Sequence, residues 1–254
     1  MSEDNATGPD FVSADIGIVH ATAMEMAPFF ARCDRVRKYL GGNLTFRGGL
    51  LGDIRVALVQ CGLGPEKARR ATQALIDGHD PKWIISAGFS GALTPDLKVG
   101  DIVVGTSIVG TEGREVAIDL KMPASPQTGL YVGRLVMTDQ LVRTIADKKS
   151  LAEKYQALAV DMESRAVADV CKSVKARFLA IRAVSDDLAA DLPAEVLTMV
   201  GDTGSVRLGA ALGALWKRPG SWKEMWRLRD QGTLAADKLA KFLDGVIVQL
   251  HAAG

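Results

Sequence analysis

ALAVDMESRAVADVCKSVKARFLAIRAVSDD, residues 157–187, is the stretch that decides the fold. It opens with a short apolar run, continues from Glu163 with apolar residues at helical spacing, and ends with an apolar and β-branched run at residues 178–184. This order predicts a strand, a helix and a second strand, the pattern of a βαβ unit with parallel strands. Ligands usually bind beyond the carboxyl ends of such strands. We therefore expect a site near the acids that follow the two strands, Asp161, Glu163, Asp186 and Asp187.

Strands and helices alternate along the rest of the chain as well. Further strands are predicted at residues 15–20, 43–49, 54–61, 83–87, 101–109 and 131–137. Helices are predicted at residues 23–32, at residues 65–78, and from a cap at Thr138 to Lys149, with a loop at residues 110–129. The alternation predicts a single three-layer α/β/α domain with a central mixed, mostly parallel twisted sheet.

The two ends of the chain depart from this alternation. Residues 1–14 are polar and are expected to form a disordered tail, so that the domain covers residues 15–254. Residues 194–254 are expected to be C-terminal helices. Two helices are predicted there, at residues 197–216 and 221–249. We expect them to pack on the sheet and on an oligomer neighbour; a membrane-surface role for the tryptophan-bearing segment 215–229 is the alternative.

The composition restricts the class of protein. The chain has 254 residues, a formal net charge of +1, 48% hydrophobic and 24% charged residues, which is ordinary for one large globular domain. A nearly neutral chain lacks an electrostatic footprint for nucleic acid, and no apolar run has the length of a membrane span or the form of a signal peptide. The cysteines lack a CxxC motif, and no metal-ligand spacing connects them with the histidines. We therefore expect a cytoplasmic protein without a nucleic-acid partner, an integral membrane segment, a metal or a cofactor.

Four sequence motifs, in a fixed order along the chain, resemble those of a known protein superfamily. The VDMES motif followed by RAVSDD resembles the nucleoside phosphorylase and nucleosidase superfamily, and within it the stretch is similar to 5′-methylthioadenosine/S-adenosylhomocysteine nucleosidases. Two more stretches agree in order and spacing, IGIVHATAMEM at residues 16–26, and CGLGPEKA at residues 61–68 with ISAGFSGALTPDLKVGDIVV at residues 85–104. The resemblance spans roughly residues 16–192. It implies a nucleoside phosphorylase-like domain, a small-molecule nucleoside substrate and a homo-oligomer.

The reaction that the resemblance implies is cleavage of a purine N-glycosidic bond, which makes three chemical demands. The base must be protonated because an anionic purine leaves poorly, the ribosyl cation must be stabilised, and a nucleophile must reach the anomeric carbon. By resemblance, Asp186 protonates purine N7, Ser185 orients its carboxyl group, and Glu25 activates the attacking water. From the residues alone, Asp186 is also compatible with a helix cap or loop acid, and Glu25 with a solvated glutamate on the first helix.

The ribose is the next group for which the resemblance implies contacts. Glu163 is expected to bind ribose hydroxyls, since a carboxylate accepts two hydrogen bonds from a vicinal diol, and Met162 is expected to pack under the sugar. The alternative for Glu163 is an acid favoured by the helix dipole; Asp161 is expected to be structural. Arg182 is a charge inside an apolar strand and needs a buried partner, and the resemblance places it near Glu25.

The pocket is expected to include two glycine-rich turns at strand ends, where backbone approaches a ligand closely. These are Gly62-Leu63-Gly64 and Gly88-Phe89-Ser90-Gly91. Their expected lining residues are Leu63, Phe89, Ser90 and Gly91. In the nucleosidases an aromatic residue from the segment after residues 131–137 stacks on the purine. This chain has Leu141 and Val142 at the matching positions, which leaves the purine contact and the exact substrate open.

The nucleophile is expected to be water, with phosphate as the alternative. Phosphorylases of the superfamily hold phosphate with a glycine-rich first loop and with arginines. Here the first loop, residues 20–23, has no glycine, and Ser86 stands where bacterial purine phosphorylases carry arginine. Arg47 lies near another phosphate-arginine position. The GFSGAL and AVDMES motifs and the helical tail also resemble the hopanoid-pathway phosphorylase that acts on adenosylhopane, and futalosine hydrolase is a further relative.

Two other classes of protein are the alternatives to an enzyme of this superfamily. A non-catalytic nucleoside-binding protein that keeps the sugar site is the alternative that the altered ATAMEM loop allows. A Rossmann dehydrogenase is not favoured, because no strand leads into a GxGxxG motif.

Overall fold

The computed structural model describes residues 13–193, 196 and 221–253. The expected disordered tail lies almost wholly outside these residues, and so does the predicted helix at residues 197–216. The elements follow one another as β1 (Ile16–His20), α1 (Ala23–Phe30), β2 (Asp34–Gly41), β3 (Leu44–Leu51), β4 (Ile54–Gln60), α2 (Pro65–His79), β5 (Trp83–Ala92), β6 (Ile102–Gly110), β7 (Glu115–Ala117), the 3-10 turn η1 (Pro126–Thr128), β8 (Leu130–Met137), α3 (Ile145–Tyr155), β9 (Ala159–Asp161), α4 (Ser164–Val174), β10 (Arg177–Asp186) and α7 (Ser221–Ala252).

The sheet is mixed, as predicted, and part of it closes on itself. Strands β4, β1, β5 and β10 form one parallel group, and β6, β8 and β9 form another. Antiparallel pairings of β10 with β6 and of β5 with β9 join the two groups, so that five strands make a ring. The hairpin of β2 and β3 extends the sheet beyond β4, and β7 adds to β6. Antiparallel joins therefore play a larger part than the sequence pattern indicated.

The predicted βαβ unit forms its three elements, but its strands are not a parallel pair. Strand β9 runs antiparallel to β5, with Val160 opposite Gly91, whereas β10 runs parallel to β5, with Asp186 opposite the same glycine. The carboxyl ends of β9 and β10 therefore reach β5 from opposite directions. The acids that follow the two strands still lie near each other, because both strands pair with β5 at Gly91 and not because they are parallel neighbours.

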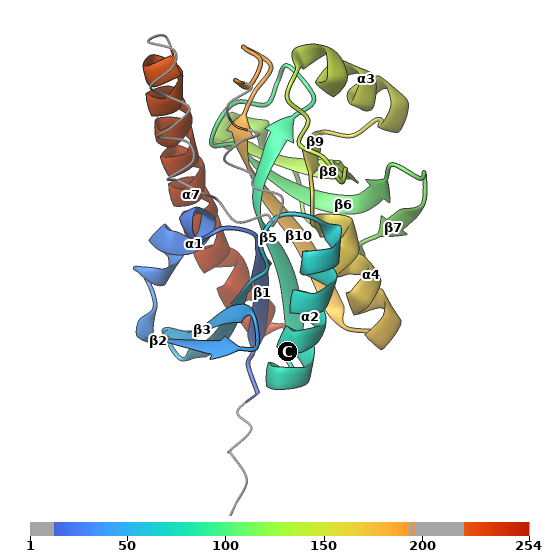
Figure 1. Cartoon of the computed structure of the whole chain (residues 1–254). Helices are drawn as coiled ribbons and strands as arrows, with labels where there is room; N and C mark the ends of the chain where they lie inside the picture. Colours follow the sequence, from blue (N-terminus) through green and yellow to red (C-terminus); the bar gives the residue numbers. More distant parts are fainter. Residues whose placement is uncertain (1–12, 194–195, 197–220, 254) are drawn as a thin grey trace, which may run out of the picture.

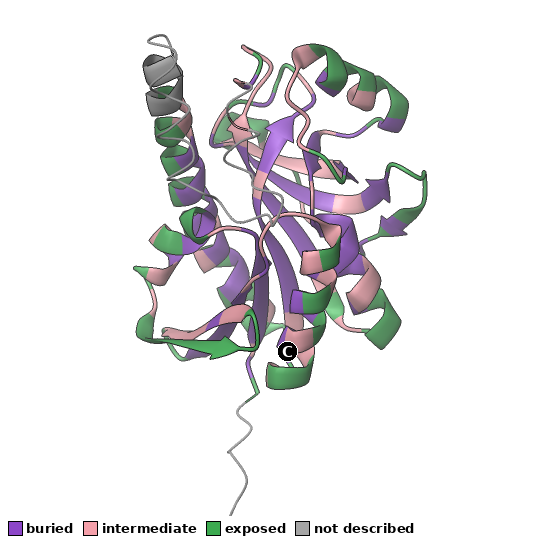
Figure 2. Ribbon diagram, in the orientation of Figure 1, coloured by how far each residue is buried: buried purple, intermediate pink, exposed green. Residues whose placement is uncertain are grey.

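Helices cover both faces of the sheet, which gives the three predicted layers (Figure 1). Helices α1 and α7 pack together, and α7 packs on β10 and β5; α2 and α4 pack together on the other face. Figure 2 shows the buried strands between helices whose outer faces are exposed. The last predicted helix, at residues 221–249, is confirmed as α7, whose buried residues include Ala235, Leu239, Leu243, Val246 and Ile247. Within the described part of the chain, no helix is both long and apolar enough to cross a bilayer.

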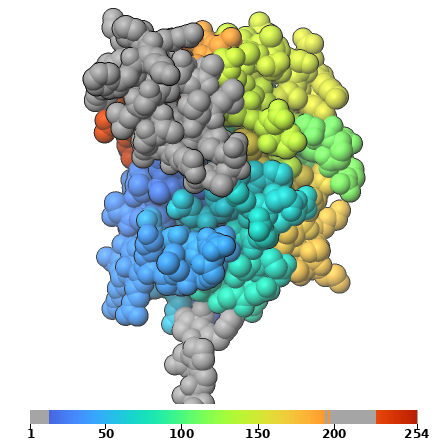
Figure 3. Space-filling view, viewed as in Figure 1, coloured from blue at the N-terminus to red at the C-terminus, as the bar shows by residue number. Residues whose placement is uncertain are grey.

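The predicted start of the third helix was wrong, the loop expected at residues 110–129 contains β7 and η1, and one strand was not predicted. The third helix begins at Ile145, not after Thr138, because Thr144 accepts a hydrogen bond from the Asp147 backbone N–H and caps it. Thr138 instead donates its hydroxyl to the carbonyl of Gln140. Strand β2 was not predicted, because every residue in it is exposed and shows no alternation of buried and exposed positions. Its hairpin with β3 forms surface on the blue side of Figure 3.

Candidate active site

The segment Gly88-Phe89-Ser90-Gly91, expected to be a turn, is instead the carboxyl half of β5. Neither glycine has a positive φ angle, so no turn requires them. A Cβ atom at Gly88 would lie 2.8 Å from Oε1 of Glu25, and one at Gly91 would lie 3.0 Å from Oδ2 of Asp186. Glycine is needed at both positions because a carboxyl group from another element approaches the strand closely there.

Glu25 is a buried acid in the first turn of α1. Its side chain belongs to a residue only 4% exposed, which excludes the solvated-glutamate alternative. Oε2 accepts a hydrogen bond from the Thr22 N–H at 2.7 Å, as in a capping box, and Oε1 accepts one from the Phe89 N–H at 3.1 Å. Burial raises the pKa of Glu25, while these hydrogen bonds and the charge of Arg182 oppose the rise. Two backbone donors thus fix the carboxyl group between α1 and β5.

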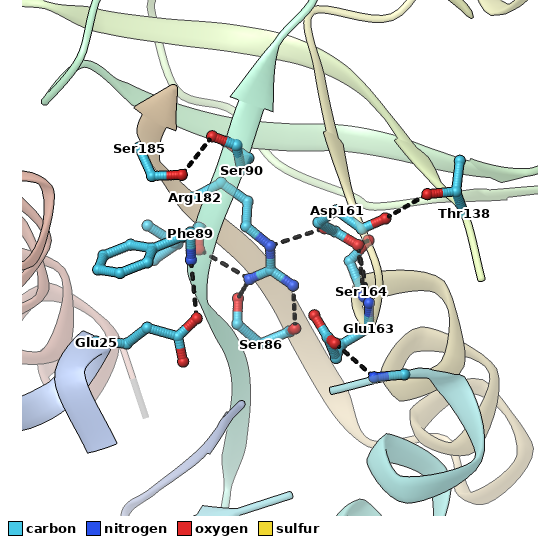
Figure 4. A network of polar contacts seen from close by, with 12 residues as sticks. Glu25, Ser86, Phe89, Ser90, Thr138, Asp161, Glu163, Ser164, Arg182 and Ser185 are labelled. Carbon is cyan, nitrogen blue, oxygen red and sulfur yellow. Dashed lines mark hydrogen bonds and ion pairs between the residues drawn. The ribbon is translucent and has the colours of Figure 1, made fainter. Parts of the chain in front are cut away.

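Arg182 has the buried partner that its position in an apolar strand requires. Its Nε donates to Oδ2 of Asp161 at 2.7 Å. Nη1 and Nη2 donate to the carbonyl and hydroxyl oxygens of Ser86, each at 2.7 Å. Figure 4 shows its guanidinium group between the carboxyl groups of Glu25 and Glu163. Nη1 also donates to the carbonyl oxygen of Ile181. Among the described residues Arg182 forms no hydrogen bond with either glutamate, so it influences them through charge alone.

Asp161 organises the turn from β9 into α4. Its Oδ1 accepts hydrogen bonds from the backbone N–H groups of Glu163 and Ser164, both at 3.0 Å, and from the Ser164 hydroxyl at 2.9 Å. Its other oxygen is paired with Arg182. A single buried carboxylate therefore sets the backbone from which Glu163 projects.

Glu163 joins this turn to the loop between β4 and α2. Its Oε1 accepts a hydrogen bond from the Gly64 N–H at 2.8 Å. Gly64 has a φ angle of 101°, a conformation that favours glycine. Burial, followed by the neighbouring Asp161, raises the pKa of Glu163 to about 8. Leu63 lies in the same loop, half-buried against the core.

Asp186, at the end of β10, is held by two side chains. Its Oδ1 accepts a hydrogen bond from the Ser185 hydroxyl at 2.8 Å, so Ser185 lies where it can orient the carboxyl group. Its Oδ2 is 2.5 Å from Nζ of Lys148 on α3. Sequence reasoning missed Lys148, since one lysine in a helix with many charged residues carries no signal of burial. A register shift between Val184 and Asp186 turns this segment relative to β5.

Ser90 offers an unused polar group beside this acid. Its hydroxyl is buried and has no hydrogen-bond partner among the described residues, while its carbonyl accepts from Ser185 at 3.3 Å (Figure 4). A buried hydroxyl without a partner costs free energy, which a bound ligand can recover. The Phe89 ring lies close to Gly232 of α7, about one van der Waals contact away from a Cβ built there.

For the remaining residues expected in the pocket, the structure gives their burial and their neighbours. Met162 is half-buried between Asp161 and Glu163 in the β9–α4 turn. Leu141 and Val142 lie in the non-helical segment before α3, where Val142 packs on a small apolar cluster that includes Val136 and Tyr155. Their contact with a purine ring stays a prediction. Glu25, Ser90, Arg182 and Asp186 thus lie along residues 88–91 of β5. Glu163 lies beyond the Arg182 guanidinium, and Lys148 is added beside Asp186.

Known proteins resemble this chain over most of its length. A family model described as the phosphorylase superfamily matches residues 15–212. The chain is 27% identical over 195 residues to the 5′-methylthioadenosine/S-adenosylhomocysteine nucleosidase of Staphylococcus haemolyticus, which covers 67% of this chain and 86% of that protein. It is 24% identical over 201 residues to the enzyme of the same name from Maridesulfovibrio salexigens, covering 69% and 87%.

Solved structures show the same fold. The nucleosidase of Neisseria meningitidis in complex with methylthio-immucillin-A superimposes with a TM-score of 0.67 and 21% identity, covering 91% of this chain and 98% of that one. Futalosine hydrolase of Helicobacter pylori superimposes with a TM-score of 0.65 and 18% identity, covering 92% and 97%. At such identities the likeness concerns the fold.

Proposed function

Because this chain belongs to the phosphorylase superfamily, we propose that it cleaves the N-glycosidic bond of a purine nucleoside, with water as the nucleophile. One observation carries the proposal: the carboxyl groups of Glu25 and Asp186 approach residues 88–91 of β5 closely, and Glu163 lies across the buried Arg182 guanidinium from Glu25 (Figure 4). Each has a different set of partners, which suits the different duties that the reaction needs. The relatives' names favour a 5′-substituted adenosine as the substrate.

The leaving purine would be protonated by Asp186. A purine anion is a poor leaving group, so a proton delivered to N7 in the transition state lowers the barrier. Asp186 lies at a strand end, 14% of its side chain is exposed, and Ser185 fixes one of its oxygens. It can therefore meet a ligand without rearrangement of β10.

The ribose would be bound by Glu163, with Met162 and Ser90 beside it. With a pKa of about 8, Glu163 carries a proton at neutral pH in the free site. It can then donate one hydrogen bond and accept another, which suits two neighbouring hydroxyl groups. The Ser90 hydroxyl is the second polar group in reach of a ligand at this strand, since it has no partner among the described residues.

Water would be activated by Glu25. A general base works best when its pKa lies near the working pH, and burial moves the pKa of Glu25 upward. Each of its oxygens accepts one backbone hydrogen bond, which leaves lone pairs for a water molecule. Asp186 and Glu25 thus meet the demands of the leaving group and of the nucleophile, while Glu163 positions the ribose on which the cation develops.

Water is favoured over phosphate by the partners of two residues. Both side-chain and backbone oxygens of Ser86 accept from Arg182, and Arg182 is itself committed to Asp161. Arg47 lies with its guanidinium carbon 4.4 Å from the centre of the Phe30 ring. Arg182 could bind phosphate only by giving up these partners. We also propose, from the family resemblance, a homo-oligomer that works in the cytoplasm; light scattering and cell fractionation test these two points.

The test is release of free adenine from 5′-methylthioadenosine and from S-adenosylhomocysteine, each with and without inorganic phosphate. Release that ignores phosphate supports the proposal. Release only with phosphate would assign the chain to the phosphorylases and make Arg47 the next residue to change. Stabilisation of the protein by nucleosides without any product would indicate a binding protein instead.

A further inference from the structure

Lys148 is the most unusual charged residue outside the predicted site. It belongs to α3, and its side chain is 0% exposed. Its Nζ lies 2.5 Å from Oδ2 of Asp186 and 3.0 Å from the carbonyl oxygen of Asp187. Removing an ammonium group from water is strongly unfavourable, and a paired opposite charge is needed to offset that cost. Its position against a carboxylate of the candidate site calls for an explanation beyond helix packing.

Three elements meet around this ion pair and fix its geometry. Besides α3 and β10, β5 contributes Gly91, where a Cβ atom would lie 3.0 Å from Oδ2 of Asp186 and 3.3 Å from Cε of Lys148. The side chains therefore fill the space that the glycine leaves. The lysine stem is enclosed, and only the carboxylate of the pair retains access to solvent.

The chemical consequence concerns the proton that the purine needs. An aspartate in water is ionised at neutral pH, and here both oxygens of Asp186 accept hydrogen bonds, from Ser185 and from Lys148. In the contact between the two side chains, Nζ of Lys148 is the donor and so carries the hydrogen. A carboxylate without a proton cannot serve as a general acid unless its partner supplies one.

We propose that Lys148 is a positioning residue that acts through Asp186: the pair, and not Asp186 alone, protonates the leaving base. As the N-glycosidic bond breaks and its electrons pass to the purine, Asp186 gives a proton to the base and takes one from the Lys148 ammonium group. Lys148 is left as a neutral amine and regains a proton from solvent, while the attacking water loses one to Glu25. Glu25 then releases its proton to solvent, so that protons and charge balance over the cycle.

The first test separates the leaving group from the sugar. This inference rests on the proposed function, so the wild-type protein must first release adenine; if it does not, the proposed function fails before Lys148 is tested. Lys148→Met is then compared on the purine nucleoside and on 4-nitrophenyl β-D-riboside, whose phenolate leaves without protonation. We expect kcat for the purine nucleoside to fall by about 100-fold or more, with KM within about threefold, and kcat for the riboside within about fivefold of wild type.

The controls address a merely structural role. Lys149→Met removes the neighbouring exposed lysine and should leave both activities unchanged. Lys148→Arg keeps the charge but holds its proton permanently, so the purine reaction should stay impaired; recovery to wild-type kcat would show that charge alone is needed and would overturn the proton step. Equal losses on both substrates in folded Lys148→Met would also overturn the proposal.

A second variant covers the cases in which Lys148→Met does not fold or the riboside is not accepted. The double variant Lys148→Met/Asp186→Asn contains no unpaired buried charge. If Lys148 acts only through Asp186, this double variant and Asp186→Asn have the same residual adenine release, within about threefold. A further tenfold loss in the folded double variant would show that Lys148 acts independently of Asp186 and would contradict the proposal.

Discussion

The two ends of the segment Gly88-Phe89-Ser90-Gly91 hold carboxyl groups in opposite ways. At Gly88, the hydrogen bonds to the Glu25 carboxyl group come from backbone N–H groups, and no cation of the described residues contacts it directly. At Gly91, Asp186 forms an ion pair with an enclosed lysine. At both ends a Cβ atom built on the glycine would lie 2.8–3.0 Å from a carboxylate oxygen, so the absence of a side chain makes room for the acid. Both carboxyl groups therefore lie equally close to the backbone of β5, but their electrostatic surroundings differ.

The difference teaches how one strand can serve two kinds of proton transfer. Burial without a bound cation raises the pKa of Glu25, and in the same way that of Glu163, which favours a group that takes up a proton. Pairing with Lys148 keeps a transferable proton beside Asp186. In the proposed reaction, the neighbours of each carboxyl group thus decide which one acts as the acid and which one as the base.

The largest effect is expected from Asp186→Asn. The amide cannot pass a proton to the purine, so kcat for adenine release should fall by roughly 1,000-fold, with little change in KM. The matched control is Asp187→Asn, since within the described part of the chain the Asp187 carboxyl accepts only from the Ala189 N–H and is not part of the ion pair. A greater loss in Asp187→Asn than in Asp186→Asn would transfer the acid role to the neighbouring residue.

Glu25→Gln should have the next largest effect. Loss of the base that takes a proton from water is expected to lower kcat by about 100-fold. The exposed Glu66 on α2 supplies the control, as its carboxyl group forms a surface pair with Arg69. Steady-state kinetics of Glu25→Gln and Glu66→Gln decide the point, and full hydrolytic activity in the first would remove Glu25 from the mechanism.

Gly88→Ala tests the close approach without changing an acid. The new Cβ would lie 2.8 Å from Oε1 and 3.2 Å from Cδ of Glu25, so the carboxyl group must shift. We expect kcat to fall about tenfold and stability to fall by about 1–3 kcal/mol, as for other overpacked sites. Gly78→Ala in α2, where a Cβ meets nothing within 4 Å, should be neutral or slightly stabilising in urea unfolding. Equal behaviour of the two alanine variants would contradict the packing argument.

The smallest effect concerns stability, through Glu163. Between its ordinary pKa of 4.5 and its folded value of about 8, the folded protein binds a proton that the unfolded chain does not. Stability therefore falls as pH rises through this window, by up to about 1.4 kcal/mol per pH unit. Glu163→Gln should make the slope shallower by about 1 kcal/mol between pH 6 and pH 7, measured by urea unfolding. An unchanged slope would mean that the pKa of Glu163 is not raised.

The sequence predicted those parts of the fold and site that have a local signal. Strands with apolar runs, the acids at the ends of β9 and β10, and the need of Arg182 for a buried partner all follow from neighbouring residues. The closed ring of strands does not, because the antiparallel joins of β5 with β9 and of β10 with β6 involve residues far apart in the chain. Lys148 was missed for the same reason, since its burial depends on Gly91 and Asp186. Gly88 and Gly91 were assigned to a turn because glycine indicates a turn and a close approach equally well.

The most direct test of the central claim is digestion of 5′-methylthioadenosine in water labelled with oxygen-18, with inorganic phosphate present, followed by mass spectrometry of the sugar. If Asp186 and Glu25 divide the leaving-group and water steps as proposed, free adenine appears together with a sugar that carries one labelled oxygen at C1. An unlabelled sugar phosphate, or intact nucleoside after prolonged incubation, would contradict hydrolysis at this site.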